Sequence, residues 1–131
     1  MSVDDRQSDE EVHVLVVDDD PLSRTVLRDA LEEAGMRVTE AADADAAIRS
    51  MATTKADVMI LDFLLPSGTG LDVWDYARER YSGLAHRTIV LTGVMDDPER
   101  EQMTDHTDLP VLAKPFETDV LIHMIRTLVE E

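Results

Sequence analysis

Side chains able to bind a cation or a phosphoryl group follow several short apolar segments of this 131-residue sequence. The clearest case is Asp62, which comes directly after the uninterrupted apolar run 58–61. A run of this kind, bounded by turn-forming residues, is typical of a strand buried on both faces. Alone, this carboxylate could simply close a strand or cap the element that follows. Other apolar runs end in groups of the same kind, at Asp18, Asp19, Thr92 and Lys114.

Together these side chains suit phosphoryl chemistry with a divalent cation. In a parallel sheet the carboxyl ends of the strands lie at one edge, so residues distant in sequence would share one pocket. Clustered carboxylates repel one another unless a positive charge joins them. Oxygen ligands without histidine or cysteine favour Mg²⁺. A carboxylate can also act as a nucleophile toward phosphorus, while a hydroxyl and an ammonium group can bind phosphoryl oxygens.

Alternating strands and helices must bring these side chains together. Apolar or β-branched segments predict five strands, at residues 12–17, 36–40, 58–62, 88–91 and 110–113. Residues with helical periodicity or capping signals follow the strands. This alternation is typical of an α/β domain with a doubly wound, parallel sheet and helices on both faces.

Capping residues predict the boundaries of the first helix. Asp20 and Pro21 are typical of a helix start, and Gly35 is typical of a position just after a helix end. The apolar stripe of this helix is expected at Leu22, Val26, Ala30 and Ala34, widened by Leu27 and Leu31.

Two later segments differ in how much apolar surface they can bury. A helix with the only tryptophan, Trp74, in its apolar face is expected to end at Ser82-Gly83. The following segment, 96–109, starts with a good capping signal but contains few apolar residues. We therefore expect a short and mobile helix there, because it has little to pack against the sheet.

Composition excludes several classes of protein. The net charge of −17, from 29 acidic and 12 basic residues, disfavours binding to nucleic acid or to anionic membranes. It allows a basic partner or a saline habitat. With no cysteine and no apolar segment long enough to span a bilayer, a cytoplasmic protein is expected. We expect residues 1–11 to be an acidic, disordered lead-in and residues 12–131 to form one domain.

Four segments, in order, resemble the signature motifs of response regulator receiver domains in two-component systems. They are Val-Val-Asp-Asp-Asp-Pro, Leu-Asp-Phe-Leu-Leu-Pro-Ser-Gly-Thr-Gly, Leu-Thr-Gly and Leu-Ala-Lys-Pro-Phe, at 16–21, 61–70, 91–93 and 112–116. The resemblance covers about residues 12–129. It implies the flavodoxin-like (βα)5 fold of chemotaxis-type receivers, with strand order 2-1-3-4-5.

The resemblance also implies a role for each acidic residue. Asp62 would be the phosphoacceptor and a ligand of Mg²⁺. Asp19 would bind the Mg²⁺ ion directly and Asp18 would bind it through water. The backbone carbonyl of Leu64 would complete the metal shell. Since Leu64 and Val94 are apolar and would flank the phosphoryl group, we expect them to exclude water and make the phosphoaspartate long-lived.

Two further positions would bind the phosphoryl group. Thr92 would hydrogen-bond a phosphoryl oxygen and move on activation, and Lys114 would pair with the group, followed by a cis peptide before Pro115. Receivers usually carry an aromatic residue three positions before this lysine, as a rotamer switch. Here that switch position is Val111, which has no ring. We therefore expect output through ordering of residues 94–109.

The implied function is transfer of a phosphoryl group from a phosphohistidine onto Asp62, without turnover of an external substrate. The donor would be a sensor histidine kinase or a histidine phosphotransfer protein, and a homodimer could form through the 4-5-5 face of receivers (fourth helix, fifth strand, fifth helix). Three alternatives remain: a receiver module of a hybrid kinase, an unphosphorylated pseudo-receiver, and a phosphohydrolase similar to haloacid dehalogenases. The last would use Asp18, Asp20, Thr92 and Lys114.

Overall fold

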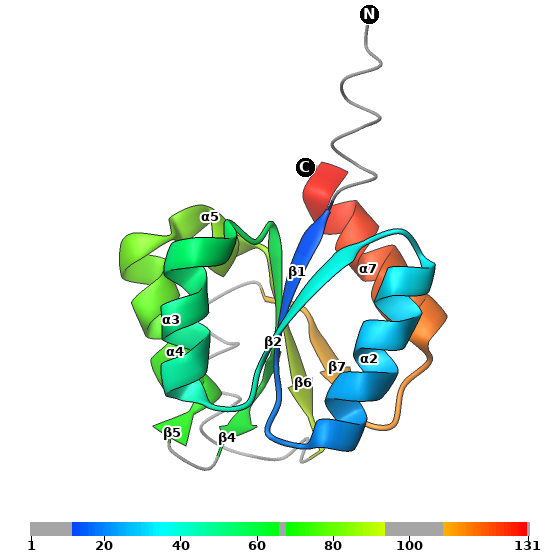
Figure 1. Cartoon of the computed structure of the whole chain (residues 1–131), viewed down its shortest axis with the longest axis horizontal. Helices are drawn as coiled ribbons and strands as arrows, with labels where there is room; N and C mark the ends of the chain where they lie inside the picture. The colour runs from blue at the N-terminus through cyan, green and yellow to red at the C-terminus, as the bar shows by residue number, and fades with distance from the viewer. Residues whose placement is uncertain (1–11, 66–67, 94–108, 131) are drawn as a thin grey trace, which may run out of the picture.

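The computed structural model describes residues 12–65, 68–93 and 109–130 of the chain. A parallel sheet lies between two layers of helices (Figure 1). Its strands are β1 (His13–Val17), β2 (Arg37–Ala41), β3 (Val58–Asp62), β6 (Thr88–Thr92) and β7 (Val111–Ala113). Their spatial order is β2-β1-β3-β6-β7. Counted along the chain this order is 2-1-3-4-5, which confirms the predicted doubly wound, flavodoxin-like fold.

The helices cover both faces of the sheet. On one face lie α2 (Pro21–Glu33) and α7 (Thr118–Glu130), and on the other lie α3 (Ala44–Thr54), α4 (Gly70–Arg80) and α5 (Ser82–His86) (Figure 1). A small antiparallel hairpin, β4 (Leu64–Leu65) with β5 (Gly68–Thr69), connects β3 to α4. The sequence does not predict this hairpin, because each strand has only two residues.

The three central strands hold the core together. Every residue of β1, β3 and β6 is buried, as predicted for strands covered on both faces. Alternate side chains point to opposite faces. Leu15, Met59 and Val90 join the cluster beneath α3, α4 and α5, whereas Val16 and Ile60 join the cluster beneath α2 and α7. Burial of these apolar side chains is the main favourable term in folding.

The predicted caps of the first helix are confirmed, and its predicted apolar stripe is confirmed only at Leu27 and Leu31. Asp20 accepts a hydrogen bond from the Leu22 N–H, and Gly35 has a positive φ of 92° after the helix end. Leu22 and Val26, however, are 70% and 52% exposed, and the buried residues of α2 are Leu27 and Leu31. The helix is therefore rotated about its axis, so that the second apolar row packs against the sheet.

The predicted end of the later helix at Ser82-Gly83 is also wrong. α4 ends at Arg80, and the short helix α5 begins at Ser82. Two features stabilise α5: Leu84 and Ala85 are buried, and the indole N–H of Trp74 donates to the Ala85 carbonyl at 3.1 Å. Trp74 packs against the core cluster, as predicted.

Other expectations concern segments beyond the described part of the chain. The acidic lead-in 1–11 lies outside it, as does the predicted helix at 96–109 except for Leu109. Within the described ranges, no helix has the length and apolar character needed to cross a bilayer.

Candidate functional site

The carboxyl edge of the sheet gathers the residues that the sequence singles out. Asp62 and Thr92 are the last residues of β3 and β6, while Asp18 and Lys114 directly follow β1 and β7. These strands are hydrogen-bonded neighbours in parallel register. Residues far apart in the sequence therefore meet at one edge, as predicted.

Three carboxylates form a compact acidic cluster at this edge. One oxygen each from Asp18, Asp19 and Asp62 lies within 4.8 Å of the others. Asp18 and Asp62 are buried, whereas Asp19 is exposed to solvent. Buried carboxylates this close together require compensating positive charge. A set of hard oxygen donors with one open, solvent-facing member fits a hydrated Mg²⁺ ion.

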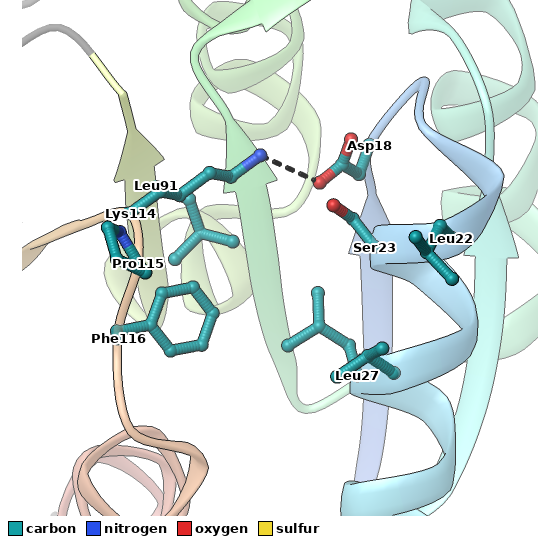
Figure 2. Close-up of a pocket in the computed structure, with 9 residues that line it drawn as sticks. Asp18, Leu22, Ser23, Leu27, Leu91, Lys114, Pro115 and Phe116 are labelled. Carbon is teal, nitrogen blue, oxygen red and sulfur yellow. Dashed lines mark hydrogen bonds and ion pairs between the residues drawn. The ribbon is translucent and has the colours of Figure 1, made fainter.

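Lys114 provides part of this positive charge. Its Nζ donates to Oδ2 of Asp18 at 3.1 Å and to Oδ2 of Asp62 at 3.2 Å; Figure 2 shows the side chain reaching toward Asp18. Burial by itself lowers the pKa of Lys114, but the hydrogen bond to Asp18 and the charges of both carboxylates outweigh that effect and raise the pKa above its usual value. Lys114 is therefore an ammonium ion at neutral pH.

The carboxylate of Asp18 is fixed from two sides. Its Oδ1 accepts the backbone N–H of Asp20 at 3.0 Å, and its Oδ2 accepts the ammonium of Lys114. The backbone N–H of Asp18 donates to the carbonyl of Ala41 at 3.1 Å. A carboxylate held in this way suits contact with a cation through a water molecule, whereas the exposed Asp19 suits direct contact with the cation.

A backbone hydrogen bond connects Thr92 to Lys114. The Lys114 N–H donates to the Thr92 carbonyl at 2.9 Å, and Thr92 is 2% exposed. The peptide between Lys114 and Pro115 is cis, as expected. The hydroxyl, the ammonium and the acidic cluster thus follow adjacent strands, an arrangement that can bind a phosphoryl group next to a cation.

For three other predicted positions, the roles proposed from the sequence stay predictions. Val111 lies in β7 and packs against the core cluster on the α3–α4 face. Leu64 opens β4, two residues after Asp62, and the metal-binding role of its carbonyl stays a prediction. Val94 and the segment 94–108 lie outside the described residues, so the expectations on phosphoaspartate lifetime and on ordering stay predictions.

Gly70 allows α4 to start directly against the end of β3. Its backbone N–H donates to the carbonyl of Phe63 at 2.6 Å. A Cβ atom at this position would lie 2.9 Å from the Cα of Phe63 and 3.1 Å from the carbonyl oxygen of Asp62. Any larger residue would therefore displace the backbone around Asp62.

A pocket of about 430 Å³ opens beside Asp18 and Lys114, between α2 and the start of α7 (Figure 2). Its walls are mainly apolar and include Leu22, Val26 and Phe116. The exposed apolar row of α2 therefore faces this pocket. Leu22 and Val26 border the pocket and do not pack against the sheet.

Sequence reasoning missed Arg24, which contacts the acidic loop. Its Nη1 donates to the backbone carbonyl of Asp18 at 2.8 Å, and its Nε donates to Glu40 at 3.1 Å. The chain contains ten arginines, and no spacing pattern distinguishes this one. Its position one turn after the helix cap Asp20 was the available signal.

Comparisons with known proteins agree with this geometry. Residues 14–126 match the family model described as the response regulator receiver domain. The chain is 30% identical over 123 residues to the probable transcriptional regulatory protein TcrX of Mycobacterium tuberculosis, covering 94% of this chain and 52% of TcrX. It is 36% identical over 104 residues to the KDP operon transcriptional regulatory protein KdpE of Escherichia coli, covering 79% of this chain and 45% of KdpE. The chain thus spans about half the length of these relatives.

Solved structures show the same fold. The receiver domain of a sensor histidine kinase from Pseudomonas aeruginosa has a TM-score of 0.81 and 28% identity, covering 92% of this chain and 99% of that one; it holds a magnesium ion in its active-site cleft. The response regulator TrrA from Thermotoga maritima, in complex with Mg²⁺ and BeF, has a TM-score of 0.78 and 27% identity, with coverage of 88% and 97%.

Proposed function

The chain belongs to the response regulator receiver domain family, and from this premise we propose that it accepts a phosphoryl group on Asp62 from a phosphohistidine, in a Mg²⁺-dependent reaction. The observation that carries the proposal is the approach of Asp18, Asp19 and Asp62 to within 4.8 Å, with Lys114 donating to two of them. A structural salt bridge would not need three carboxylates around one ammonium ion.

The residues divide the work of phosphoryl transfer among them. A carboxylate oxygen of Asp62 attacks phosphorus; the O–P bond forms while the N–P bond of the donor breaks, and the bonding electron pair returns to the imidazole nitrogen. Lys114 binds a phosphoryl oxygen as a compact point charge, and Thr92 donates its hydroxyl to another. Asp18, Asp19 and Asp62 would hold Mg²⁺, which supplies the positive charge that offsets the phosphoryl oxygens.

This function is one of signalling and not of turnover on an external substrate. The donor is a sensor histidine kinase or a histidine phosphotransfer protein, and the expected location is the cytoplasm. Direct binding of nucleic acid by this segment is disfavoured by its net charge of −17. A homodimer through the 4-5-5 face and the loss of the aromatic switch at Val111 remain parts of the proposal.

One alternative differs in context and two differ in chemistry. A receiver module of a hybrid kinase would use the same site, so the two contexts share one mechanism. A pseudo-receiver would keep the fold without phosphorylation. The phosphohydrolase alternative loses support, because the carboxylate of Asp20 caps α2 by accepting from the Leu22 N–H and the Ser23 hydroxyl and so does not face a substrate.

Intact-mass spectrometry tests the proposal. The protein is incubated with Mg²⁺ and acetyl phosphate, and we expect the mass of one phosphoryl group to be added. Asp62→Asn should gain nothing, and omission of Mg²⁺ should prevent the gain in the wild type. An unchanged wild-type mass, also with a purified phosphotransfer protein as donor, would favour the pseudo-receiver. Phosphorylation of Asp62→Asn to the wild-type level would exclude Asp62 as the acceptor.

A further inference from the structure

Arg24 connects the acidic loop after β1 to the neighbouring strand β2. It lies in the second turn of α2 and donates from Nη1 to the backbone carbonyl of Asp18 at 2.8 Å. Its Nε donates to Oε1 of Glu40, in β2, at 3.1 Å. The side chains of Arg24 and Glu40 are 18% and 28% exposed, so the pair is only partly accessible to solvent.

The carbonyl that Arg24 contacts belongs to the peptide between the two acidic residues Asp18 and Asp19. A peptide group is planar, so fixing this carbonyl fixes the orientation of the following Cα as well. The position of this Cα limits the directions in which the side chain of Asp19 can point. Among the described residues, no hydrogen bond ties the carboxylate of Asp19 itself to another group, in contrast with that of Asp18. Within this described part of the chain, the protein can therefore orient the Asp19 side chain only through contacts of the backbone.

Glu40 in turn fixes Arg24. Its second oxygen, Oε2, accepts from Nη1 of Arg28 at 3.0 Å, one helical turn further along α2. Glu40 thus lies between two arginines and holds the first by a charge-assisted hydrogen bond. The contact of Arg24 with Asp18 is a hydrogen bond to a backbone carbonyl, so it is directional and not a general attraction between charges.

We propose that Arg24 is a positioning residue for the cation site: by holding the Asp18–Asp19 peptide, it turns both carboxylates toward Asp62. This inference rests on the proposed function of the acidic cluster as a Mg²⁺ site. Removal of such an outer partner of a metal site typically lowers metal affinity about 10- to 100-fold.

The direction in which Mg²⁺ affinity changes when Arg24 is removed distinguishes a positioning role from a purely electrostatic one. Arg24 carries a positive charge close to three carboxylates that would bind a cation. By Coulomb's law alone, its removal should strengthen Mg²⁺ binding. A positioning role predicts the opposite, a weaker binding. Arg28 offers a matched control, because it pairs with the same Glu40 but shows no contact with Asp18 among the described residues.

The experiment measures Mg²⁺ binding without any phosphodonor, by isothermal titration calorimetry of the whole chain. Arg24→Met should bind Mg²⁺ about 10- to 100-fold more weakly than the wild type, whereas Arg28→Met should bind it equally or more tightly. Arg24→Lys keeps the charge but lacks the planar guanidinium whose two separate nitrogens contact Asp18 and Glu40, so its affinity should fall between those of Arg24→Met and the wild type. Backbone amide chemical shifts of Asp18 and Asp19 should change in both Arg24 variants.

The outcomes distinguish this inference from the proposed function. If the wild type binds no Mg²⁺, the proposed function falls, and this inference falls with it. If the wild type binds Mg²⁺ and Arg24→Met binds it as tightly or more tightly, Arg24 does not position the site and the proposed function stands. If thermal unfolding shows that Arg24→Met does not fold, Arg24→Lys decides: weaker binding supports positioning, and wild-type affinity overturns it.

Discussion

At the amino edge of the sheet, where β1, β3 and β6 begin, polar groups satisfy one another. The Asp57 carboxylate accepts the backbone N–H of His13 at 2.9 Å, the Asp57 N–H donates to the His13 carbonyl at 2.7 Å, and Arg87 donates from Nε to the Asp57 carbonyl at 2.7 Å. At the carboxyl edge, three carboxylates lie together around Lys114. The same sheet therefore ends in a hydrogen-bonded network on one side and in a cluster with more carboxylates than ammonium groups on the other.

This difference indicates which edge serves stability and which serves function. Groups that stabilise a fold are paired within the fold, as at Asp57. Groups kept in excess, as at Asp62, carry an energetic cost that a ligand can remove, and such sites are typical of function. Removal of a carboxylate should therefore lower the free energy of unfolding at the amino edge and raise it at the carboxyl edge.

The largest effect is expected from Lys114→Met in the absence of Mg²⁺. The substitution leaves the buried carboxylates of Asp18 and Asp62 without their ammonium partner, which should cost about 2–3 kcal/mol. Urea unfolding followed by the fluorescence of Trp74 measures it. Lys55→Met, at the chain's other lysine, is the control and should be nearly neutral because Lys55 is exposed.

The same pair of variants should differ with pH in a defined direction. Since the pKa of Lys114 is raised, its stabilising contribution is fully present below the ordinary lysine value of 10.5 and is lost as pH rises through the folded-state value. The gap between wild type and Lys114→Met should thus close at high pH. A gap that persists there would mean that packing of the lysine stem, and not its charge, stabilises the edge.

The next effect is expected at the amino edge. Asp57→Ala removes the acceptor of the His13 N–H and should cost about 1–2 kcal/mol. Mg²⁺ should not restore this loss, whereas it should restore part of the loss in a variant of the carboxyl edge. Restoration of Asp57→Ala by Mg²⁺ would show that the two edges are not separate.

Asp62→Asn is expected to stabilise the protein. The change relieves repulsion within the acidic cluster while leaving an oxygen that can accept from Lys114, so a gain of about 0.5–1 kcal/mol is expected without Mg²⁺. Thermal and urea unfolding at low ionic strength measure the gain. A loss of stability would indicate that Asp62 stabilises the fold through its ion pair with Lys114. Its role would then be structural, as is that of Asp57 at the opposite edge.

The smallest effect concerns His13. Burial lowers its pKa, aided by the charge of Arg37 and opposed by Asp57. A lowered pKa of a base means that the unfolded chain binds more protons just below pH 6.5, so stability should rise as pH increases through this range. In His13→Gln this rise should be smaller. Parallel pH profiles for the two proteins would remove His13 as the cause.

Strong local signals predicted the alternation of strands and helices, whereas the strand order came from the resemblance to a family. Buried strands are continuous apolar runs, and the sequence boundaries of β3 match the structure. Parallel strands bring their carboxyl ends to one edge, so the convergence of Asp18, Asp62 and Lys114 could be predicted from the parallel arrangement alone. The motifs around them added the resemblance to a family.

The missed features depend on contacts between distant segments. The rotation of α2, which exposes Leu22 and buries Leu27, is set by packing against the sheet and α7, and both apolar rows are compatible with the sequence. α5 is stabilised by the hydrogen bond from Trp74 to the Ala85 carbonyl and by the burial of Leu84 and Ala85. The side chain of Arg24 is held by Glu40, which lies sixteen positions away in the sequence. Periodicity along one segment contains none of this information.

The outer strands of the sheet have a consequence for the protein at high concentration. β7 has only three residues, and β2 carries the charged residues Arg37 and Glu40. Unpaired strand edges invite addition of a strand from another molecule, and shortness or charge opposes it. Both free edges of this sheet are thus protected against fibre-like growth, which leaves helix-covered faces as the surfaces through which copies of the chain can meet.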